Sequence, residues 1–542
     1  MKKFASLLLA LAMTVGMLAG CSSEEGSSTG EAPAQEVTVA ISSTFATLDP
    51  ALISTTHMAH VYGNMGSNFY RTDADGKLEY DLGENLEKSE DGLTYTFTIK
   101  EGLKWSDGEP LTAEHFVYGL KRAIGYGPDN AYTKKNLVNF IAGAEEAANA
   151  AMDVADMTNV GITALDDTTF QVTLSTPCPY FERIFSGNVT APMRPDFAPE
   201  HDSSWSVNGT YPSSGPMVLQ SISPEEEAVL VKNENYWNAE NVTLEKATFV
   251  VMTDSTAQLN AFRTGDIDVA MSVPSEVTTN SEYDANIIMP EKYISNYFVL
   301  LNSGPKATVE ALKDENVRKA LALAIDKETM INILGSKAIV ELDGYVPYGF
   351  EGTDGNDFRA EKSYDAFNLE EAKSLMEAAG YNENNHLKFE YLYSNSQFHA
   401  DVAQILQQMW SQIYVDVELK AIEMGVFYDY VDNGDFTTCR YSNNDATDPL
   451  SHFQLFTTDS QIDGCQAITD PVLDQMVEEA YSITDHDEYI AKLHEIEDYF
   501  VGEKQYVIPL FTQNSVVLVQ SNVKDLWLTV GGSPIVTGIT VE

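Results

Sequence analysis

The sequence predicts a multidomain α/β protein, and three observations lead to this fold class. The 542 residues are enough for two to four domains of about 100 to 200 residues each. Hydrophobic residues make up 44% of the chain and charged residues 21%, a profile typical of globular proteins and not of disordered or disulfide-dense ones. From position 37 onward, strand-like and helix-like segments alternate, which favours an α/β or a mixed α+β arrangement.

The first twenty residues have the pattern of a secretory signal peptide. Lys2 and Lys3 precede an apolar stretch over positions 4–17, which is too short to span a membrane as a helix. The next four residues, Leu-Ala-Gly-Cys, resemble the bacterial lipobox, and this resemblance implies that Cys21 is lipidated and becomes the first residue of the mature protein. An ordinary secretory signal with an incidental cysteine is the alternative.

Residues 21–36 are predicted to form a flexible, lipid-anchored tether. The stretch from Ser22 to Glu36 contains no aromatic or branched aliphatic side chain, so it has nothing to bury in a core. A coil of this length spans about 20 Å, which holds a folded body clear of a membrane surface. No later apolar run approaches 18 residues, so we expect the body to be anchored and not inserted.

Strands and helices are predicted from the period of the hydrophobic pattern. Tyr95 to Ile99 alternates with period two, and similar strands are predicted at 169–174 and 228–232. A helix is predicted after Thr112, whose side chain is suited to an N-cap, and it continues through Ile124. Further helices are predicted at 318–330, at 370–379 before Gly380, and at 402–410.

The charge balance argues against a nucleic-acid partner, and the motifs argue against cofactor, metal and catalytic sites. Lys and Arg number 32 against 82 Asp and Glu, a formal charge of −50, and no basic patch is present, so we expect no nucleic acid. We find no phosphate-binding loop, dinucleotide fingerprint or zinc spacing, so no cofactor and no metal are expected. Two matches to hydrolase motifs are discounted. The match at 26–30 lies in the tether, and the match at 303–306 contains Pro305, which disrupts the helix that such a site needs, so no enzymatic activity is predicted.

Three cysteines follow Cys21 in the sequence. In an oxidising exterior, a disulfide between Cys439 and Cys465 would close a loop of about 25 residues and stabilise the fold by about 3 kcal/mol. Cys178 lies between two prolines and has no evident partner, so we expect a buried thiol there.

Several separated segments resemble one known family. They resemble the peptide and nickel class of extracytoplasmic solute-binding proteins of ABC importers (family 5), and among these the oligopeptide-binding lipoproteins most. The segments follow the family's order, and the likeness covers the body from 37 to 542. They are Leu48–Pro50, Lys104–Gly108, Ala113–Tyr118, Asn233–Trp237, Arg263–Asp268, Asn316–Lys327 and Ala378–Tyr381.

The resemblance implies a two-lobed periplasmic-binding-protein fold with a hinge and an extra inserted domain, which makes three domains. Lobe 1 is expected to combine residues 37–66, 210–294 and 515–542, the inserted domain to cover 67–209, and lobe 2 to cover 295–514. The resemblance also implies a monomer outside the cytoplasm, anchored to the outer face of the bacterial cell membrane. Such a protein captures short peptides between its closing lobes and delivers them to the transmembrane subunits of an ABC permease.

The resemblance further implies where a peptide binds. Asp445, in the stretch Asp445–Pro449, matches the acid that neutralises the ligand's α-amino group in oligopeptide-binding relatives. His399 and Arg440 match basic positions that meet the ligand's carboxylate. Tyr297 and Asn443 belong to the segments 297–301 and 440–443, which are expected to offer strand edges to the ligand main chain.

Departures from the family pattern leave alternatives open. Ser442, Asn443 and Asn444 stand where relatives usually carry an aromatic residue before the loop acid, so the side-chain pockets differ. A relative that has changed ligand, to a nickel chelate, haem, a sugar or a signalling peptide, is the second hypothesis. Plain structural roles are also open: an exposed loop acid at Asp445, a capping or solvent-facing ring at His399, and an acid-paired guanidinium at Arg440.

Overall fold

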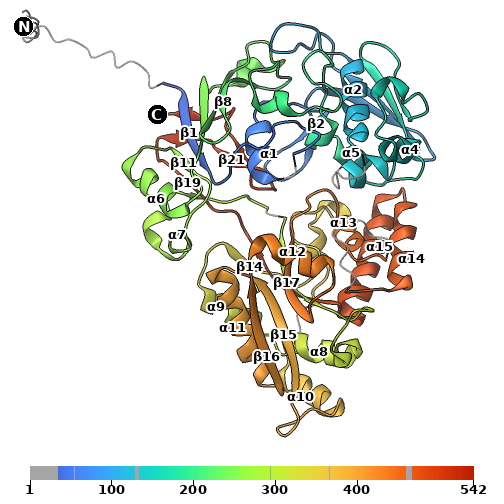
Figure 1. Cartoon of the computed structure of the whole chain (residues 1–542), viewed down its shortest axis with the longest axis vertical. Helices are drawn as coiled ribbons and strands as arrows, with labels where there is room; N and C mark the ends of the chain where they lie inside the picture. Colours follow the sequence, from blue (N-terminus) through green and yellow to red (C-terminus); the bar gives the residue numbers. More distant parts are fainter. Residues whose placement is uncertain (1–33, 54, 128–132, 293, 365–366, 459–466) are drawn as a thin grey trace, which may run out of the picture. The chain divides into compact units, whose positions relative to one another are not determined.

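The computed structural model describes residues 34–542 except 54, 128–132, 293, 365–366 and 459–466 (Figure 1). The chain divides into a unit from Met1 to Ala34 and a compact unit from Gln35 to Glu542. The predicted signal peptide, the predicted lipidation site Cys21 and the cysteine Cys465 lie outside the described residues. Within the described ranges, no helix has the length and apolar character needed to cross a bilayer.

The first sheet joins segments from distant parts of the sequence. It has seven strands in the order β12-β19-β11-β1-β10-β9-β8. β1 (Glu36–Ile41) runs parallel to β10 (Lys246–Val251) and to β11 (Val269–Ala270), so both neighbours of the first strand come from more than 200 positions later. The remaining strands are β8 (Met217–Ser223), β9 (Glu227–Lys232), β12 (Ile287–Ile288) and β19 (Val517–Val519).

A separate antiparallel sheet forms between these segments. Its order is β4-β5-β7-β6, with β4 (Gly83–Lys88), β5 (Thr94–Ile99), β6 (Ile162–Ala164) and β7 (Thr169–Thr173). The alternation predicted at 95–99 is confirmed, because Tyr95, Phe97 and Ile99 are buried while the residues between them are half-buried. α2 (Ala113–Gly125) contacts β6 and β7, and it begins with the predicted Thr112 cap, where His115 closes a reciprocal capping box.

The third sheet has six strands in the order β14-β18-β13-β17-β15-β16. In Figure 1, α9 and α11 lie beside it, and α11 contacts β15 and β16. The strands are β13 (Asn296–Leu301), β14 (Ile339–Glu341), β15 (Leu387–Ser394), β16 (Val415–Ile422), β17 (Thr438–Asn443) and β18 (Val507–Gln513). The helices are α8 (Glu315–Leu323), α9 (Lys327–Leu334), α10 (Leu369–Ala378) and α11 (Gln397–Ser411).

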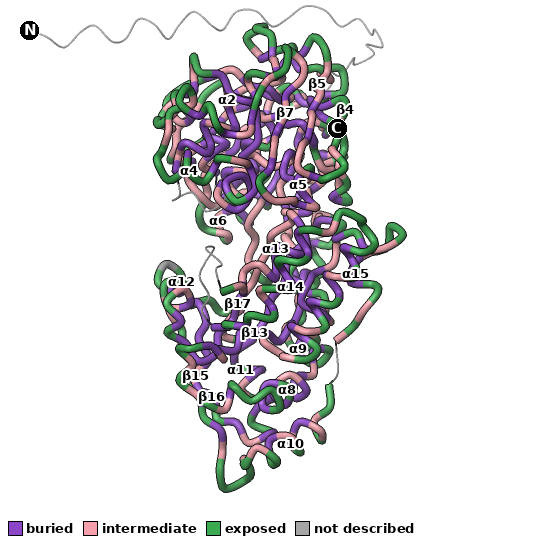
Figure 2. The backbone as a smooth tube through the Cα atoms, turned by 90° about the vertical axis from the view of Figure 1, so that its right-hand side faces the viewer, coloured by how far each residue is buried: buried purple, intermediate pink, exposed green. Residues whose placement is uncertain are grey.

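Two predictions about this region are wrong. The single helix predicted at 318–330 is two helices, α8 and α9, because the Asp326 side chain accepts the Thr329 N–H and caps a new helix. The free strand edge predicted at 297–301 does not exist, because β13 pairs with β17 on one side and β18 on the other. Every residue of β13 is buried (Figure 2).

The predicted end of the helix before Gly380 and the predicted burial of Cys178 are confirmed. α10 is followed by Gly380 with φ of 94°, a left-handed conformation in which glycine avoids the strain of a side chain. Cys178 is a buried thiol without a disulfide, and burial raises its pKa. Cys439 is buried in β17, and since Cys465 lies outside the described residues, the disulfide stays a prediction.

The remaining helices and strands are not part of the three larger sheets. The helices are α1 (Thr56–Tyr62), α4 (Ala144–Asn149), α5 (Phe181–Ile184), α6 (Ser255–Thr264), α7 (Glu276–Thr279), α12 (Met424–Asp432), α13 (Pro449–Gln454), α14 (Pro471–Tyr481) and α15 (His486–Glu497). The strands are β2 (Tyr70–Thr72), β3 (Leu78–Tyr80), β20 (Val523–Lys524), β21 (Trp527–Leu528), β22 (Pro534–Ile535) and β23 (Thr540–Val541).

The segments that carry the family resemblance have structural roles. Asp49 accepts two hydrogen bonds from the Arg122 guanidinium on α2, at 2.8 and 2.5 Å, and both side chains are fully buried. The Trp105 indole donates to Nδ1 of His115 at 3.2 Å. These contacts tie the segment after β1 to α2 and tie the Trp105 loop to the start of that helix, so these motif residues support the scaffold.

Candidate functional site

Three of the predicted site residues line one cavity of about 450 Å³. Tyr297 comes from β13, Arg440 from the neighbouring strand β17, and His399 from the first turn of α11. The Ser396 side chain caps α11 by accepting the His399 N–H at 3.2 Å, which places the imidazole at this end of the sheet. The other lining residues are Ser295, Met424, Tyr428, Ser442, Asn444, Gln513, Asn514 and Ser515.

Arg440 is buried, and no described residue acts as its counterion. Its residue is only 3% exposed, its Nη2 donates to Ser394 Oγ at 2.6 Å, and its guanidinium lies 4.4 Å from the centre of the Phe427 ring. Nε is buried without a hydrogen-bond partner. Among the residues that the structure describes, no carboxylate lies within ion-pair distance of Arg440, so the predicted alternative of an acid-paired guanidinium is not what the structure shows.

His399 and Tyr297 form a hydrogen-bonded pair beside Arg440. The Tyr297 hydroxyl and Nδ1 of His399 are 3.0 Å apart, and the Tyr297 ring stacks on Phe511 with centroids 4.7 Å apart. Burial, and then the charge of Arg440, lower the pKa of His399 to about 4. His399 is therefore uncharged at neutral pH, so it offers the cavity a neutral hydrogen-bonding ring and not a second cation.

The loop after β17 is held by a histidine that the sequence did not single out. Asn443 Nδ2 donates to Nδ1 of His452 at 3.1 Å, and Nε2 of His452 donates to the Asp445 carbonyl oxygen at 3.0 Å. Burial, and then Lys135, lower the pKa of His452 to about 3, so the ring is neutral and can accept and donate at once. Asn443 thus fixes the loop through its side chain.

The position of His452 follows from a local motif. Asp448 caps α13 by accepting the Leu450 N–H at 2.8 Å, and Pro449 occupies the first helical position. Asp448 is therefore the N-cap residue of α13. Burial raises the pKa of Asp448 to about 6, and the Tyr489 hydroxyl donates to its Oδ1 at 2.5 Å.

Asp445 forms an ion pair with a lysine from another part of the chain. Its Oδ2 contacts Nζ of Lys135, which lies in a helical segment from Lys134 to Val138, and its Oδ1 accepts the Thr447 N–H at 2.8 Å. The Asp445 side chain is 14% exposed, so it is not the exposed loop acid of the alternative reading. The sequence offers no signal for this pair, because the two residues are over 300 positions apart.

Residues of the same loop also line a second, larger cavity. Its volume is about 820 Å³, and its lining includes Asn136, Ala446 and Thr447, the immediate neighbours of the ion pair. Asn444 lines the smaller cavity instead. Arg183 Nε supports the loop by donating to the Ala446 carbonyl oxygen at 3.1 Å. The Asp445 loop therefore contributes residues to both cavities.

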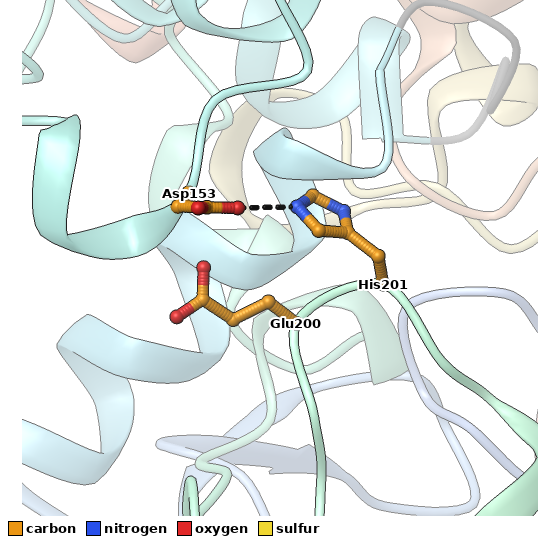
Figure 3. A group of neighbouring side chains, drawn as sticks. All are labelled: Asp153, Glu200 and His201. Carbon is orange, nitrogen blue, oxygen red and sulfur yellow. Dashed lines mark hydrogen bonds and ion pairs between the residues drawn. The ribbon is translucent and has the colours of Figure 1, made fainter.

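One surface cluster has the composition of a metal site. Asp153, Glu200 and His201 lie together (Figure 3), and His201 Nε2 is 2.7 Å from Asp153 Oδ1. Glu200 accepts the Val154 N–H at 2.6 Å. Contacts within the protein explain this geometry, and none of the three residues lines either cavity, so the cluster receives no functional assignment.

Sequence comparison places the chain among known proteins. The family model described as bacterial extracellular solute-binding proteins, family 5 Middle, matches residues 77–464, more than half of the chain. The oligopeptide-binding protein OppA of Bacillus subtilis (strain 168) is 27% identical over 487 residues, which cover 88% of this chain and 87% of OppA. The probable deoxycholate-binding periplasmic protein YgiS of Escherichia coli (strain K12) is 27% identical over 486 residues, with coverages of 88% and 87%.

Structural comparison agrees with the family model. MppA, a periplasmic murein tripeptide-binding protein, in its unliganded open form matches with a TM-score of 0.77 and 23% identity, over 94% of this chain and 98% of that one. This likeness shows the two-lobed periplasmic-binding-protein fold. With the family model matched over most of the folded body, the chain belongs to family 5 of the bacterial extracellular solute-binding proteins.

Proposed function

We propose that this protein captures short peptides outside the cytoplasm and delivers them to the transmembrane subunits of an ABC permease. The relative OppA is named as an oligopeptide-binding protein, which supports peptides as the ligand class. In this proposal the protein acts as a monomer anchored to the outer face of the membrane through a lipid on Cys21.

The observation that carries the proposal is the uncompensated charge of Arg440. The protein has a formal charge of −50, yet none of the described residues that line the smaller cavity is Asp or Glu. A buried guanidinium without a counterion is costly, and a ligand carboxylate would remove that cost. Arg recognises carboxylates through paired N–H donors, so the carboxyl end of a peptide fits this position.

Neighbouring groups can complete the carboxylate site. If the Tyr297 hydroxyl donates to Nδ1 of His399, the imidazole proton resides on Nε2, which can then donate to the ligand. Among the described residues, β17 pairs with β15 only through Thr438 and Cys439, so its backbone from Arg440 to Asn443 pairs on the β13 side alone. That edge is where we propose that the ligand main chain binds.

Asp445 remains our proposal for the residue nearest the ligand's amino end. It lies five positions after Arg440, beyond the end of β17, so a ligand extended along the strand from Arg440 would reach it. Its carboxylate is already paired with Lys135, so it does not need a positive charge from the ligand.

The first experiment is native mass spectrometry of the purified mature protein, followed by sequencing of any small molecules released on denaturation. We expect a mixed set of peptides that share a length range and not a sequence, because main-chain and terminal groups are what the site recognises. A single non-peptide mass would contradict peptide capture.

A second experiment tests the carboxylate site directly. A tetraalanine peptide with a free carboxylate should bind at least about tenfold more tightly than its carboxyl amide, and Arg440→Met should abolish this preference. Arg263→Met, on the exposed face of α6, is the matched control and should leave the preference unchanged. Equal affinity for acid and amide in the unmodified protein would refute the assignment of Arg440.

A carboxylated non-peptide ligand is the second candidate. The relative YgiS is named as probable deoxycholate-binding, and an unpaired Arg440 suits any carboxylate. The other ligand-changed hypotheses, a nickel chelate, haem or a sugar, gain no supporting observation from the described residues. The mass of the released ligand separates all of these from peptides.

A further inference from the structure

The ammonium group of Lys135 occupies the partner position that Asp445 would offer to a ligand amino group. Lys135 is 7% exposed, and its Nζ contacts Asp445 Oδ2. The other carboxylate oxygen of Asp445 accepts the Thr447 N–H at 2.8 Å. Both oxygens are therefore engaged before any ligand is bound.

The charges around this pair are already close to balance. Asp448 is buried on the same loop and stabilises the charged form of Lys135. Arg183 donates to the carbonyl oxygen of Ala446, which lies between the two acids in the sequence. A ligand ammonium added here would crowd a third cation against two carboxylates, one of which burial holds partly protonated near pH 6. Bringing a further charge into a buried and compensated site is unfavourable.

We propose that Lys135 is a specificity-determining residue that substitutes for the ligand's α-ammonium. With Lys135 in this position, the protein can bind peptides whose amino group is blocked, and peptides that extend past Asp445 with further amino-terminal residues. The inference rests on the proposed peptide-binding function. The cavity of about 820 Å³ beside the pair provides space for an amino-terminal extension, since Asn136, Ala446 and Thr447 line it.

The test compares two forms of one peptide. Tetraalanine and N-acetyl-tetraalanine, both with a free carboxylate, are titrated into the mature protein by calorimetry at pH 6. Burial lowers the pKa of Lys135 to about 7, so at this pH its ammonium group is present. We expect the two forms to bind within about threefold of each other, because Asp445 needs no charge from the ligand.

Removal of the lysine charge should change the preference. In Lys135→Met, Asp445 loses its counterion, so the free-amino form should bind at least about tenfold more tightly than the acetylated form. Replacement of Asp445 by Asn in the same variant should remove that preference again. Lys134→Met is the matched control, because Lys134 is the adjacent, partly exposed lysine, and it should behave like the unmodified protein.

The outcomes are distinguishable. A preference of tenfold or more for the free amino form in the unmodified protein would overturn the role of Lys135, and this result needs no variant to fold. An unchanged ratio in folded Lys135→Met would overturn it as well. If neither form binds to the folded protein, the proposed peptide-binding function itself fails.

Discussion

Two adjacent basic residues of the smaller cavity differ in charge. Arg440 keeps its charge in a buried position, since a guanidinium does not lose its proton in proteins. His399, next to it, is held neutral by burial and by that same charge, which lower its pKa to about 4. The cavity therefore contains one cation and one neutral hydrogen-bonding ring.

The charge state of His399 leads to a prediction on pH. His399→Gln should weaken binding of acetylated tetraalanine by less than about 1.5 kcal/mol, since it removes one neutral hydrogen bond. The ratio of the affinities of His399→Gln and of the unmodified protein should stay constant between pH 6 and pH 8, because a pKa of about 4 leaves His399 neutral throughout. Calorimetric titrations across this range check the result. A drop in affinity near pH 6.5 that disappears in His399→Gln would show that the histidine is charged when it binds.

At the scale of elements, capping side chains decide where helices begin. The hydrophobic pattern over 318–330 favours one helix, yet the structure has two, with the break just before Asp326. Asp326 accepts the Thr329 N–H at 2.9 Å and the Thr329 hydroxyl at 2.7 Å. The satisfied N-terminal donors of α9 favour the break over a continuous helix.

Loss of this cap should destabilise the protein. Asp326→Ala is expected to lower the free energy of unfolding by about 1 kcal/mol, measured by urea denaturation. Glu328→Ala, exposed in the first turn of the same helix, is the control and should change it by less than about 0.5 kcal/mol. Equal effects of the two variants would mean that the cap does not set the start of α9.

At the scale of the whole molecule, buried ion pairs connect parts that lie far apart in the sequence. Asp49, just after β1, and Arg122, on α2, are fully buried partners. Removal of one partner leaves the other charge buried and uncompensated, which is the costly case for an ion pair.

Arg122→Met should therefore lower the free energy of unfolding by about 3 to 5 kcal/mol. Arg71→Met is the matched control, because Arg71 pairs with Glu79 at the surface with half of its side chain exposed, and the expected loss is below about 1 kcal/mol. Urea denaturation measures both. Similar losses in the two variants would contradict the role of burial.

Stability should also fall in mild acid. Among the described residues, burial is the largest cause that lowers the pKa of six histidines. The pKa falls to about 3 for His60 and His452 and to about 4 for His115 and His399, and it is also lowered for His57 and His494. The unfolded chain binds protons at these residues near pH 6.5, so the native state loses relative stability as the pH falls from 6.5 toward 4.

Asp448 acts in the opposite direction in part of this range. Its raised pKa of about 6 favours the native state as the pH falls from 6 toward 3.8, but it is one group against six histidines. We expect a lower free energy of unfolding at pH 5 than at pH 7 in urea denaturation. A higher value at pH 5 would show that the histidines are not buried in neutral form.

Local patterns predicted the parts of the fold that depend on neighbouring residues. The period-two strand at 95–99, the Thr112 cap and the glycine after α10 all follow from groups within a few positions of each other. The separated family motifs also predicted the family and the two-lobed fold.

The sequence by itself determined the family, the fold class and the residues Tyr297, His399 and Arg440 that line one cavity. Only the tertiary structure decided that β13 has no free edge, that His399 is neutral, and that Asp445 already has a partner in Lys135. The physical reason is that strand position, burial and ion pairing depend on residues hundreds of positions apart, and only folding brings these residues into contact.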